Sequence, residues 1–145
     1  MIYTVSITIN LPRTRVIELF DNPDYLKEWM PGLISFETIS GKTGEVGTKS
    51  RLKFQMGKRT MELIETITVR NLPDEFSGTY EAQGVFNIVK NKFIEISENQ
   101  TNYISEQEFQ FKGFMKIVGW IFPSMFKKQS MTYLTNFKKF AESKE

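Results

Sequence analysis

The chain alternates between hydrophobic and polar residues over most of its length, a pattern typical of β-strands with one buried face. In residues 2–10 the hydrophobic side chains occupy every second position: Tyr3, Val5, Ile7 and Ile9. Similar runs, closed by turn residues, predict six further strands over residues 33–39, 48–56, 59–70, 75–83, 85–96 and 101–111. Because the connections between most of these runs are short, neighbouring strands must be antiparallel.

Helical patterns lie on either side of this block of strands. After the first strand, Pro12 begins a short helix that ends near Phe20, and Asn22 and Pro23 supply the N-cap and first residue of another. Residues 113–142 have the spacing of a long helix, which Pro123 should kink or split. One half of its first part is hydrophobic: Phe114, Met115, Ile117, Val118, Ile121, Phe122, Met125 and Phe126. Trp120 falls outside this half.

This order of elements predicts one α+β domain over residues 1–145. We expect a curved seven-stranded antiparallel sheet that grips the long C-terminal helix, with the two short helices closing one end. A curved sheet and a helix leave room for a pocket between them. The chain is rich in side chains that suit such a cavity, with 13 Phe, 5 Tyr, 2 Trp and 7 Met, but they would equally fill an ordinary core.

Composition removes most catalytic chemistries. The chain has no Cys and no His, which excludes disulfides, thiolate nucleophiles and the commonest metal ligands, and we expect neither a metal nor a cofactor. A formal charge of +2 is too small to indicate a nucleic-acid partner. We see no export signal and no segment that would span a bilayer, so a cytoplasmic protein is the expectation.

Several short stretches resemble a known superfamily. They are Leu11–Asp21 (LPRTRVIELFD), Leu26–Gly32 (LKEWMPG), Gly44–Thr48 (GEVGT), Phe109–Gly113 (FQFKG) and Met125–Gln129 (MFKKQ). With the order of elements, they resemble the START-like superfamily of helix-grip proteins, whose bacterial members include the polyketide cyclase/dehydrase and lipid-transport group called SRPBCC. The resemblance implies a cavity for hydrophobic molecules such as lipids, polyketides or hormones. Only some members are catalytic, and the resemblance supplies no fixed set of catalytic residues.

Polar residues that share a strand face with hydrophobic ones are candidates for the cavity wall. Glu65 is an acid on the otherwise apolar face of residues 61–69, which makes it the one candidate proton carrier. Alternatively, it pairs with a neighbouring Arg or Tyr, or a bulge turns it outward. The full set predicted to bind a ligand is Phe54, Glu65, Tyr80, Asn87, Asn91, Tyr103, Ser105, Gln107, Phe122 and Met125. The polar members of this set could instead satisfy one another or hold buried water.

Three functions are compatible with these features. The first is binding of a small hydrophobic or amphipathic, lipid- or polyketide-like ligand. The alternative is a polyketide cyclase/dehydratase-type enzyme in which the carboxylate of Glu65, or Tyr80, moves protons. In a third, Trp120 and the basic C-terminal helix dock weakly on a partner or a membrane surface, although the lysine pattern favours a solvated helix face over such docking.

Overall fold

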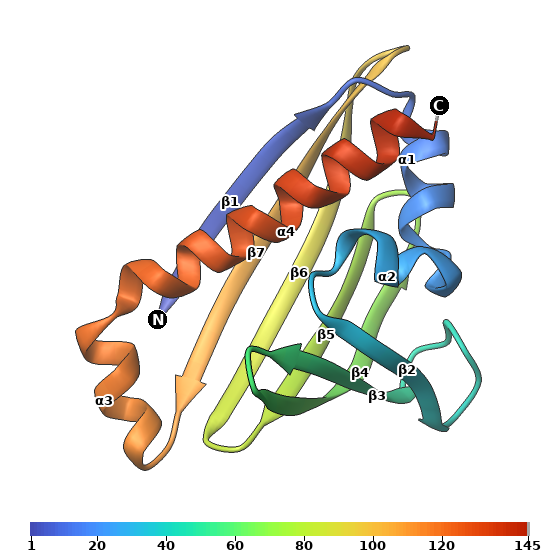
Figure 1. Ribbon diagram of the computed structural model, residues 1–145. Coiled ribbons are helices and arrows are strands. Elements are labelled where there is room, and N and C mark those ends of the chain that lie inside the picture. The colour runs from blue at the N-terminus through green and yellow to red at the C-terminus, as the bar shows by residue number, and fades with distance from the viewer. Residues whose placement is uncertain (145) are drawn as a thin grey trace.

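The computed structural model describes residues 1–144, which form one antiparallel sheet and a set of helices on its concave side (Figure 1). The strands are β1 (Ile2–Ile9), β2 (Leu33–Ser40), β3 (Lys49–Met56), β4 (Arg59–Asn71), β5 (Glu75–Ala82), β6 (Val85–Ser97) and β7 (Gln100–Phe111). Their order in the sheet is β1-β7-β6-β5-β4-β3-β2, so only β1 lies beside a strand that is distant in sequence. The predicted α+β fold and its seven antiparallel strands are confirmed.

Along the chain, the helices begin and end close to the residues that the sequence pattern predicts. They are α1 (Arg13–Phe20), the 3₁₀ turn η1 (Pro23–Tyr25), α2 (Leu26–Trp29), α3 (Phe114–Ile121) and α4 (Pro123–Ser143). The side chain of Asn22 accepts a hydrogen bond of 3.0 Å from the backbone N–H of Asp24, as its predicted capping role requires. Pro123 starts α4 and so splits the predicted long helix in two. Among the described residues, no helix is long and apolar enough to cross a bilayer.

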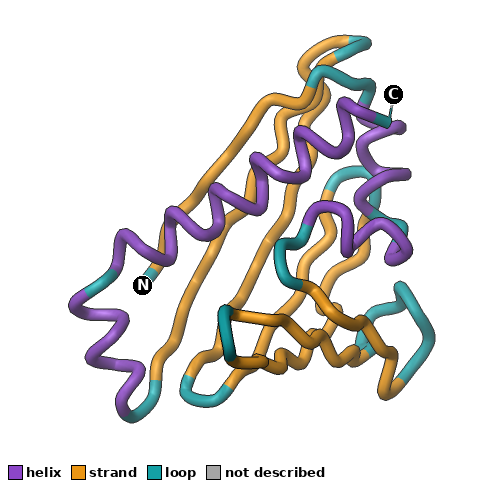
Figure 2. The backbone as a smooth tube through the Cα atoms, in the orientation of Figure 1, coloured by secondary structure: helices purple, strands orange, loops and turns teal. Residues whose placement is uncertain are grey.

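The helix α4 runs diagonally across the open face of the sheet, while α1 and α2 close one end (Figures 1 and 2). Its buried side chains, including Leu134 and Phe137, pack with Val5 and Ile9 of β1 into the larger of two hydrophobic clusters. A polar contact adds to this packing, because the hydroxyl of Tyr3 lies 2.7 Å from Ser130 Oγ and donates to the carbonyl oxygen of Phe126.

A second, smaller hydrophobic cluster lies at the other edge of the sheet. It is built on Leu33, Leu52 and Phe54 of β2 and β3. The register shifts within β2 where it pairs with β3, and again between Ile67 and Val69 of β4 where it pairs with β5. Such irregularities let this edge of the sheet bend. The two clusters therefore form on separate parts of a curved sheet, and a space remains between them.

The position of α3 differs from the expectation for the long helix. After Phe122 the chain changes direction, so that α3 lies at the end of the sheet and not across it (Figure 1). Its contact with the sheet is close but small: a Cβ at Gly119 would lie 2.5 Å from the ring of Phe111. The expectation that the long C-terminal helix as a whole lies across the sheet is therefore wrong for α3. Several residues of the hydrophobic half of this region are exposed: Phe114, Ile117, Ile121, Phe122 and Met125.

Candidate functional site: a cavity between the sheet and α4

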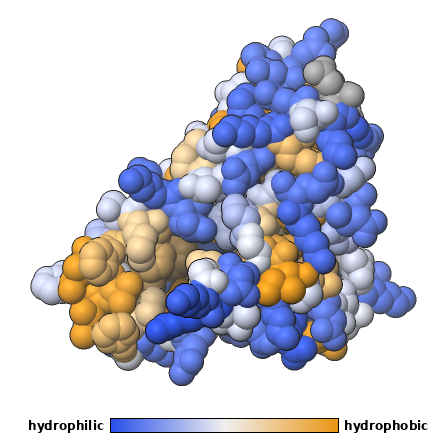
Figure 3. Space-filling view, in the orientation of Figure 1, coloured by the Kyte–Doolittle hydropathy of each residue, from blue (hydrophilic) through white to orange (hydrophobic). Residues whose placement is uncertain are grey.

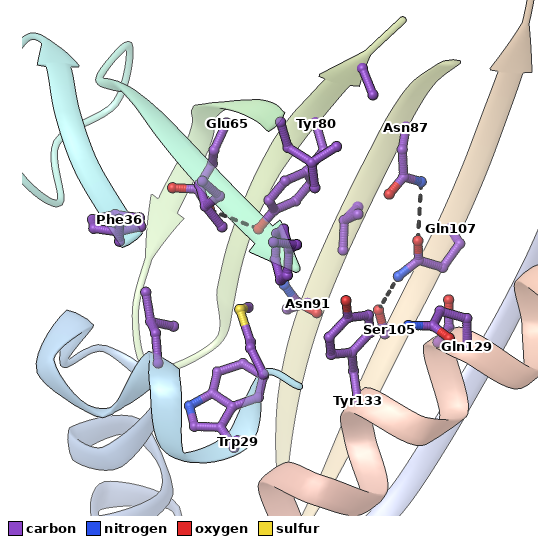
Figure 4. A pocket seen from close by; sticks show the side chains of 18 of the residues that line it. Trp29, Phe36, Glu65, Tyr80, Asn87, Asn91, Ser105, Gln107, Gln129 and Tyr133 are labelled. Carbon is purple, nitrogen blue, oxygen red and sulfur yellow. Dashed lines mark hydrogen bonds between the residues drawn. The ribbon is translucent and has the colours of Figure 1, made fainter. Parts of the chain in front are cut away.

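A cavity of about 400 Å³ lies between the concave face of the sheet and the helices α2 and α4 (Figure 4). Such a volume is within the range of small-molecule sites in proteins. Most of its lining is hydrophobic, and the contributing side chains include Phe20, Leu26, Trp29, Met30, Phe36, Leu52, Phe54, Met61, Leu63, Ile67, Phe76, Val89, Phe109, Met115, Phe126 and Leu134. The polar side chains are few and come mainly from the central strands β4 to β7.

Glu65 and Tyr80 form a hydrogen-bonded pair on the cavity wall. They are direct neighbours across the β4–β5 ladder, and the hydroxyl of Tyr80 donates a bond of 2.7 Å to Glu65 Oε2 (Figure 4). Burial raises the pKa of Glu65, and the hydrogen bond from Tyr80 opposes this rise only in part. The pKa of Tyr80 is raised well above its usual value, first by burial and then by the nearby charge of Glu65. Tyr80 therefore stays protonated and remains a donor at neutral pH.

A chain of amide and hydroxyl groups follows β6 and β7. Asn87 Nδ2 donates to Gln107 Oε1 at 3.1 Å and to the carbonyl oxygen of Glu108, and Gln107 Nε2 donates to Ser105 Oγ at 2.7 Å (Figure 4). Since Ser105 is buried, its hydroxyl would be costly to leave unpaired, and the chain satisfies it internally. The expectation that some polar residues pair with one another is confirmed here.

Asn91 and Tyr103 form a further pair deeper in the cavity. The hydroxyl of Tyr103 donates to Asn91 Oδ1 at 3.1 Å, and burial raises the pKa of Tyr103, so it too remains protonated. Some polar atoms of the lining stay available: within residues 1–144, neither Glu65 Oε1 nor Asn91 Nδ2, for example, takes part in a hydrogen bond of the structure. A bound molecule with a donor for the carboxyl group and an acceptor for the amide would meet both.

The cavity brings together most of the residues that the sequence predicts for it. Its lining includes Phe54, Glu65, Tyr80, Asn87, Asn91, Tyr103, Ser105 and Gln107. Phe122 and Met125 do not belong to the lining, because the break before Pro123 leaves both side chains about half exposed on the outer side of the α3–α4 junction.

Three polar residues of α4 line the cavity and are absent from the sequence prediction: Gln129, Ser130 and Tyr133. Their positions follow from helical spacing, because Ser130 and Tyr133 lie four residues before the buried Leu134 and Phe137. Extending that stripe toward the N-terminus would have found them. Burial also raises the pKa of Tyr133, which keeps its hydroxyl protonated.

Trp29 contributes both to the core and to the cavity. Its ring packs against Phe20 and, edge to face, against Phe137, with centroids 6.0 Å and 5.0 Å apart. Trp29 thus belongs to the larger hydrophobic cluster, and its indole also lines the cavity. Its Nε1 is buried without a hydrogen-bond partner in the described part of the chain.

The described residues hold no cluster of three or more Asp or Glu that is arranged to bind a metal ion, and the chain has neither His nor Cys. The ionisable residues of the lining are Glu65, Asp21, whose carboxylate is paired with Arg70, and the phenols of Tyr80, Tyr103 and Tyr133. Such groups donate and accept hydrogen bonds and move protons.

Known proteins share this architecture, as comparison with solved structures shows. No family model matches the sequence, and no curated protein sequence matches it either. Solved structures do match over nearly the whole chain. The crystal structure of Ara h 8.0201 is 15% identical, with a TM-score of 0.76, and the match covers 99% of this chain and 98% of that one. The fold is the helix grip that the sequence resemblance implies.

Two of the similar structures are enzymes by name. The Zhui aromatase/cyclase from Streptomyces sp. R1128 is 11% identical, with a TM-score of 0.81 and coverage of 98% of this chain and 93% of that chain. Norcoclaurine synthase from Thalictrum flavum is 16% identical, with a TM-score of 0.73 and coverage of 97% and 85%. Identities this low show a shared fold and leave the activity of this chain to be argued from its own cavity.

Proposed function

We propose that this protein binds a small hydrophobic or amphipathic molecule, lipid- or polyketide-like, in the cavity between the sheet and α4. The single observation that carries the proposal is an apolar cavity of about 400 Å³ in which Glu65 Oε1 and Asn91 Nδ2 are left without partners. Removing apolar ligand surface from water supplies affinity, and these polar atoms orient the ligand. The comparisons support a fold that suits such binding.

The test uses a pair of variants on one strand. Leu63→Trp adds bulk to a side chain that faces the cavity, while Ile64→Trp adds the same residue on the opposite face of β4. We expect the amphipathic fluorophore anilinonaphthalene sulfonate to bind wild type and Ile64→Trp equally. Leu63→Trp should bind it about tenfold more weakly, since the added indole takes up much of the available space.

Native mass spectrometry of the freshly purified protein gives a second readout. A co-purified small molecule should be present with wild type and with Ile64→Trp and absent with Leu63→Trp. Circular dichroism checks that both variants fold. Equal dye binding by the two folded variants would show that the fluorophore does not enter this cavity, and the proposal would fail.

The hydrogen-bonded pair of Glu65 and Tyr80 favours one alternative, an enzyme of the cyclase/dehydratase type. A carboxyl group with a raised pKa is a stronger base when ionised than an ordinary glutamate, and Glu65 lies in a largely apolar cavity. In this alternative Glu65 accepts a proton from a carbon beside a ligand carbonyl group. That carbon then attacks a second carbonyl carbon of the same chain and closes the ring, and the resulting alkoxide takes the proton back from Glu65. Glu65 next removes a second proton from the attacking carbon and delivers it to the new hydroxyl group, which leaves as water as the carbon–carbon double bond forms.

A linear poly-β-keto thioester analogue is a suitable substrate for this alternative. Wild type should convert it to a cyclic product, which chromatography separates from the starting material. Glu65→Gln should abolish the conversion while binding the analogue nearly as well. If Glu65→Gln cyclises the analogue at the wild-type rate, Glu65 is not the proton carrier. If wild type gives no more cyclic product than buffer alone, the binding function stands without catalysis.

A further inference from the structure

Apart from Lys116 and Gly119, every residue of α3 is hydrophobic, although the outer side of the helix has no neighbour within the described residues. Met115 and Gly119 face inward, where Met115 lines the cavity and Gly119 lies against Phe111. On the outer side Phe114 is 74% exposed and Trp120 is 83% exposed. Fully hydrophobic helices are normally buried, so this exposure marks a surface that meets something apolar.

The exposed side chains form one patch, which we call the α3 patch: Phe114, Ile117, Trp120, Ile121, Phe122 and Met125. In the space-filling view, hydrophobic residues gather at the end of the molecule where α3 lies (Figure 3). Elsewhere the same face is mainly hydrophilic. The patch is therefore a local feature of α3 and the start of α4.

The charges around the α3 patch have one sign. From Phe109 to Ala141 the chain contains no Asp and no Glu. In the same stretch exposed lysines flank the patch: Lys112 lies just before α3, Lys116 lies in its first turn, and Lys127 and Lys128 lie in the first turns of α4. A second copy of this chain would bring these lysines against like charges, which opposes pairing of two patches.

We propose that the α3 patch docks this protein on the surface of an anionic lipid bilayer. Its hydrophobic side chains enter the boundary between headgroups and acyl chains, and the flanking lysines lie against anionic headgroups. Trp120 suits the interface because an indole is apolar over most of its surface and polar at its N–H. With only eight residues, α3 is too short to cross the membrane, so it lies in the plane of the surface.

Docking would also bring the cavity close to the lipid. Met115 of α3 and Phe126 of α4 line the cavity, and both are near neighbours in sequence of exposed patch residues. A molecule leaving the bilayer at this place would meet the cavity lining directly. The docking itself is independent of what the cavity binds, so Leu63→Trp should still dock, and the two proposals can fail separately.

The test is flotation of the full chain with lipid vesicles. One set of vesicles contains phosphatidylcholine alone, and the other contains phosphatidylcholine with the anionic lipid phosphatidylglycerol. We expect wild type to float mainly with the anionic set, and about 1 M salt, where the Debye length is about 3 Å, should weaken this binding. Trp120→Ala should lose about tenfold in vesicle affinity, because most of the buried indole area is lost.

Matched control variants show whether vesicle binding depends on the α3 patch or on charged and hydrophobic residues anywhere on the surface. Lys116→Gln should lower the affinity about fivefold, while Lys139→Gln, near the far end of α4, should not change it. Ile94→Ala removes another half-exposed hydrophobic side chain, at the opposite end of the sheet, and should float like wild type. In Trp29→Phe, Trp120 is the only tryptophan, and its emission should shift to shorter wavelength on anionic vesicles.

Three results would overturn the proposal. One is that wild type floats with neither set of vesicles. Another is that Trp120→Ala floats as well as wild type. The third is that wild type self-associates in analytical ultracentrifugation whereas Trp120→Ala is a monomer, because the patch would then be covered by a second copy.

Discussion

The hydroxyl group of Tyr80 donates a hydrogen bond to Glu65 across the ladder between β4 and β5, at an oxygen–oxygen distance of 2.7 Å and inside a largely apolar cavity. The pair explains how the fold tolerates an acid at this position. Burial disfavours the ionised carboxylate, and the hydrogen bond recovers part of that cost. Since the pKa of Glu65 is still raised, the ionised form is destabilising relative to its state in the unfolded chain.

Glu65→Gln should therefore stabilise the protein at neutral pH. A carboxyl group whose pKa is raised on folding contributes stability that is present below its unfolded pKa and is lost as the pH rises through its folded pKa. Glutamine carries no charge, and its Oε1 can still accept the hydrogen bond from the Tyr80 hydroxyl group. The melting temperatures of wild type and Glu65→Gln should nearly coincide below about pH 4 and diverge in favour of the variant at higher pH.

Differential scanning calorimetry at a series of pH values makes this comparison. Glu81→Gln is the matched control, because it removes an exposed glutamate from the neighbouring strand β5. If Glu65→Gln is no more stable than wild type at pH 7, the carboxylate is better solvated in the cavity than the structure indicates.

Tyr80→Phe should have the opposite effect on stability. Without the phenol, Glu65 loses its hydrogen-bond donor, and leaving a buried polar group unpaired costs about 1–3 kcal/mol. The pKa of Glu65 should rise further, because the hydrogen bond from Tyr80 lowers it in wild type. Chemical denaturation measures the first effect, and a ¹³C NMR titration of the Glu65 side-chain carboxyl group measures the second. An unchanged carboxyl titration would mean that the pair is broken in solution.

The inner face of β6 shows why much of the cavity could be predicted from the sequence. Both faces of this strand carry hydrophobic residues. The sequence predicts that the side of Asn87 and Asn91 faces inward, because burying Lys90 and Lys92 would cost far more than burying amides. The structure places both asparagines in the cavity lining and leaves Lys90 exposed. The inward face of a strand can therefore be predicted when one of its two faces carries side chains that are much more costly to bury than those of the other.

A helix offers no such penalty where both of its sides are hydrophobic. Phe122 and Met125 belong to a stripe with helical spacing, but spacing shows which residues share a side and not what that side contacts. The decisive event is the break before Pro123, which turns α3 away from the sheet. Its direction depends on the fit of Gly119 against Phe111, a tertiary contact that no local pattern contains.

The polar clamp between β1 and α4 gives a third prediction. The Tyr3 hydroxyl binds both Ser130 Oγ and the carbonyl oxygen of Phe126, and it thereby holds the cavity-facing part of α4 against the sheet. Tyr3→Phe should lower the free energy of unfolding by about 1–2 kcal/mol. Tyr25→Phe is the control, since the ring of Tyr25 packs on Phe140 but its hydroxyl makes no hydrogen bond in the described structure.

Hydrogen exchange adds a local readout for the same variant. The amides of α4 around Ser130 should exchange faster in Tyr3→Phe than in Tyr25→Phe, because the first turns of the helix lose their only side-chain tie to β1 among the described hydrogen bonds. Equal stability and equal exchange in the two variants would show that packing alone holds α4 in place.

The contact between Gly119 and Phe111 gives a fourth prediction, on the stability of Gly119→Ala. Helix propensity predicts that this change stabilises the protein, whereas a close contact with Phe111 predicts that it destabilises it. In a helix interior, replacing Gly by Ala normally stabilises by about 0.5–1 kcal/mol, because the unfolded chain loses freedom. Here the added Cβ would lie 2.5 Å from Phe111 Cε2, far inside van der Waals contact. Gly119→Ala should instead destabilise, by about 1–3 kcal/mol, or push α3 off the end of β7. Thermal unfolding reports the first outcome, and faster hydrogen exchange confined to residues 114–121 reports the second.

Thr132→Ala, at an exposed site of α4, is the control for Gly119→Ala, since the Thr132 hydroxyl only bonds back to the carbonyl oxygen of Lys128. A Gly119→Ala protein that is more stable than wild type, with unchanged exchange in α3, would mean that this helix is not seated on Phe111.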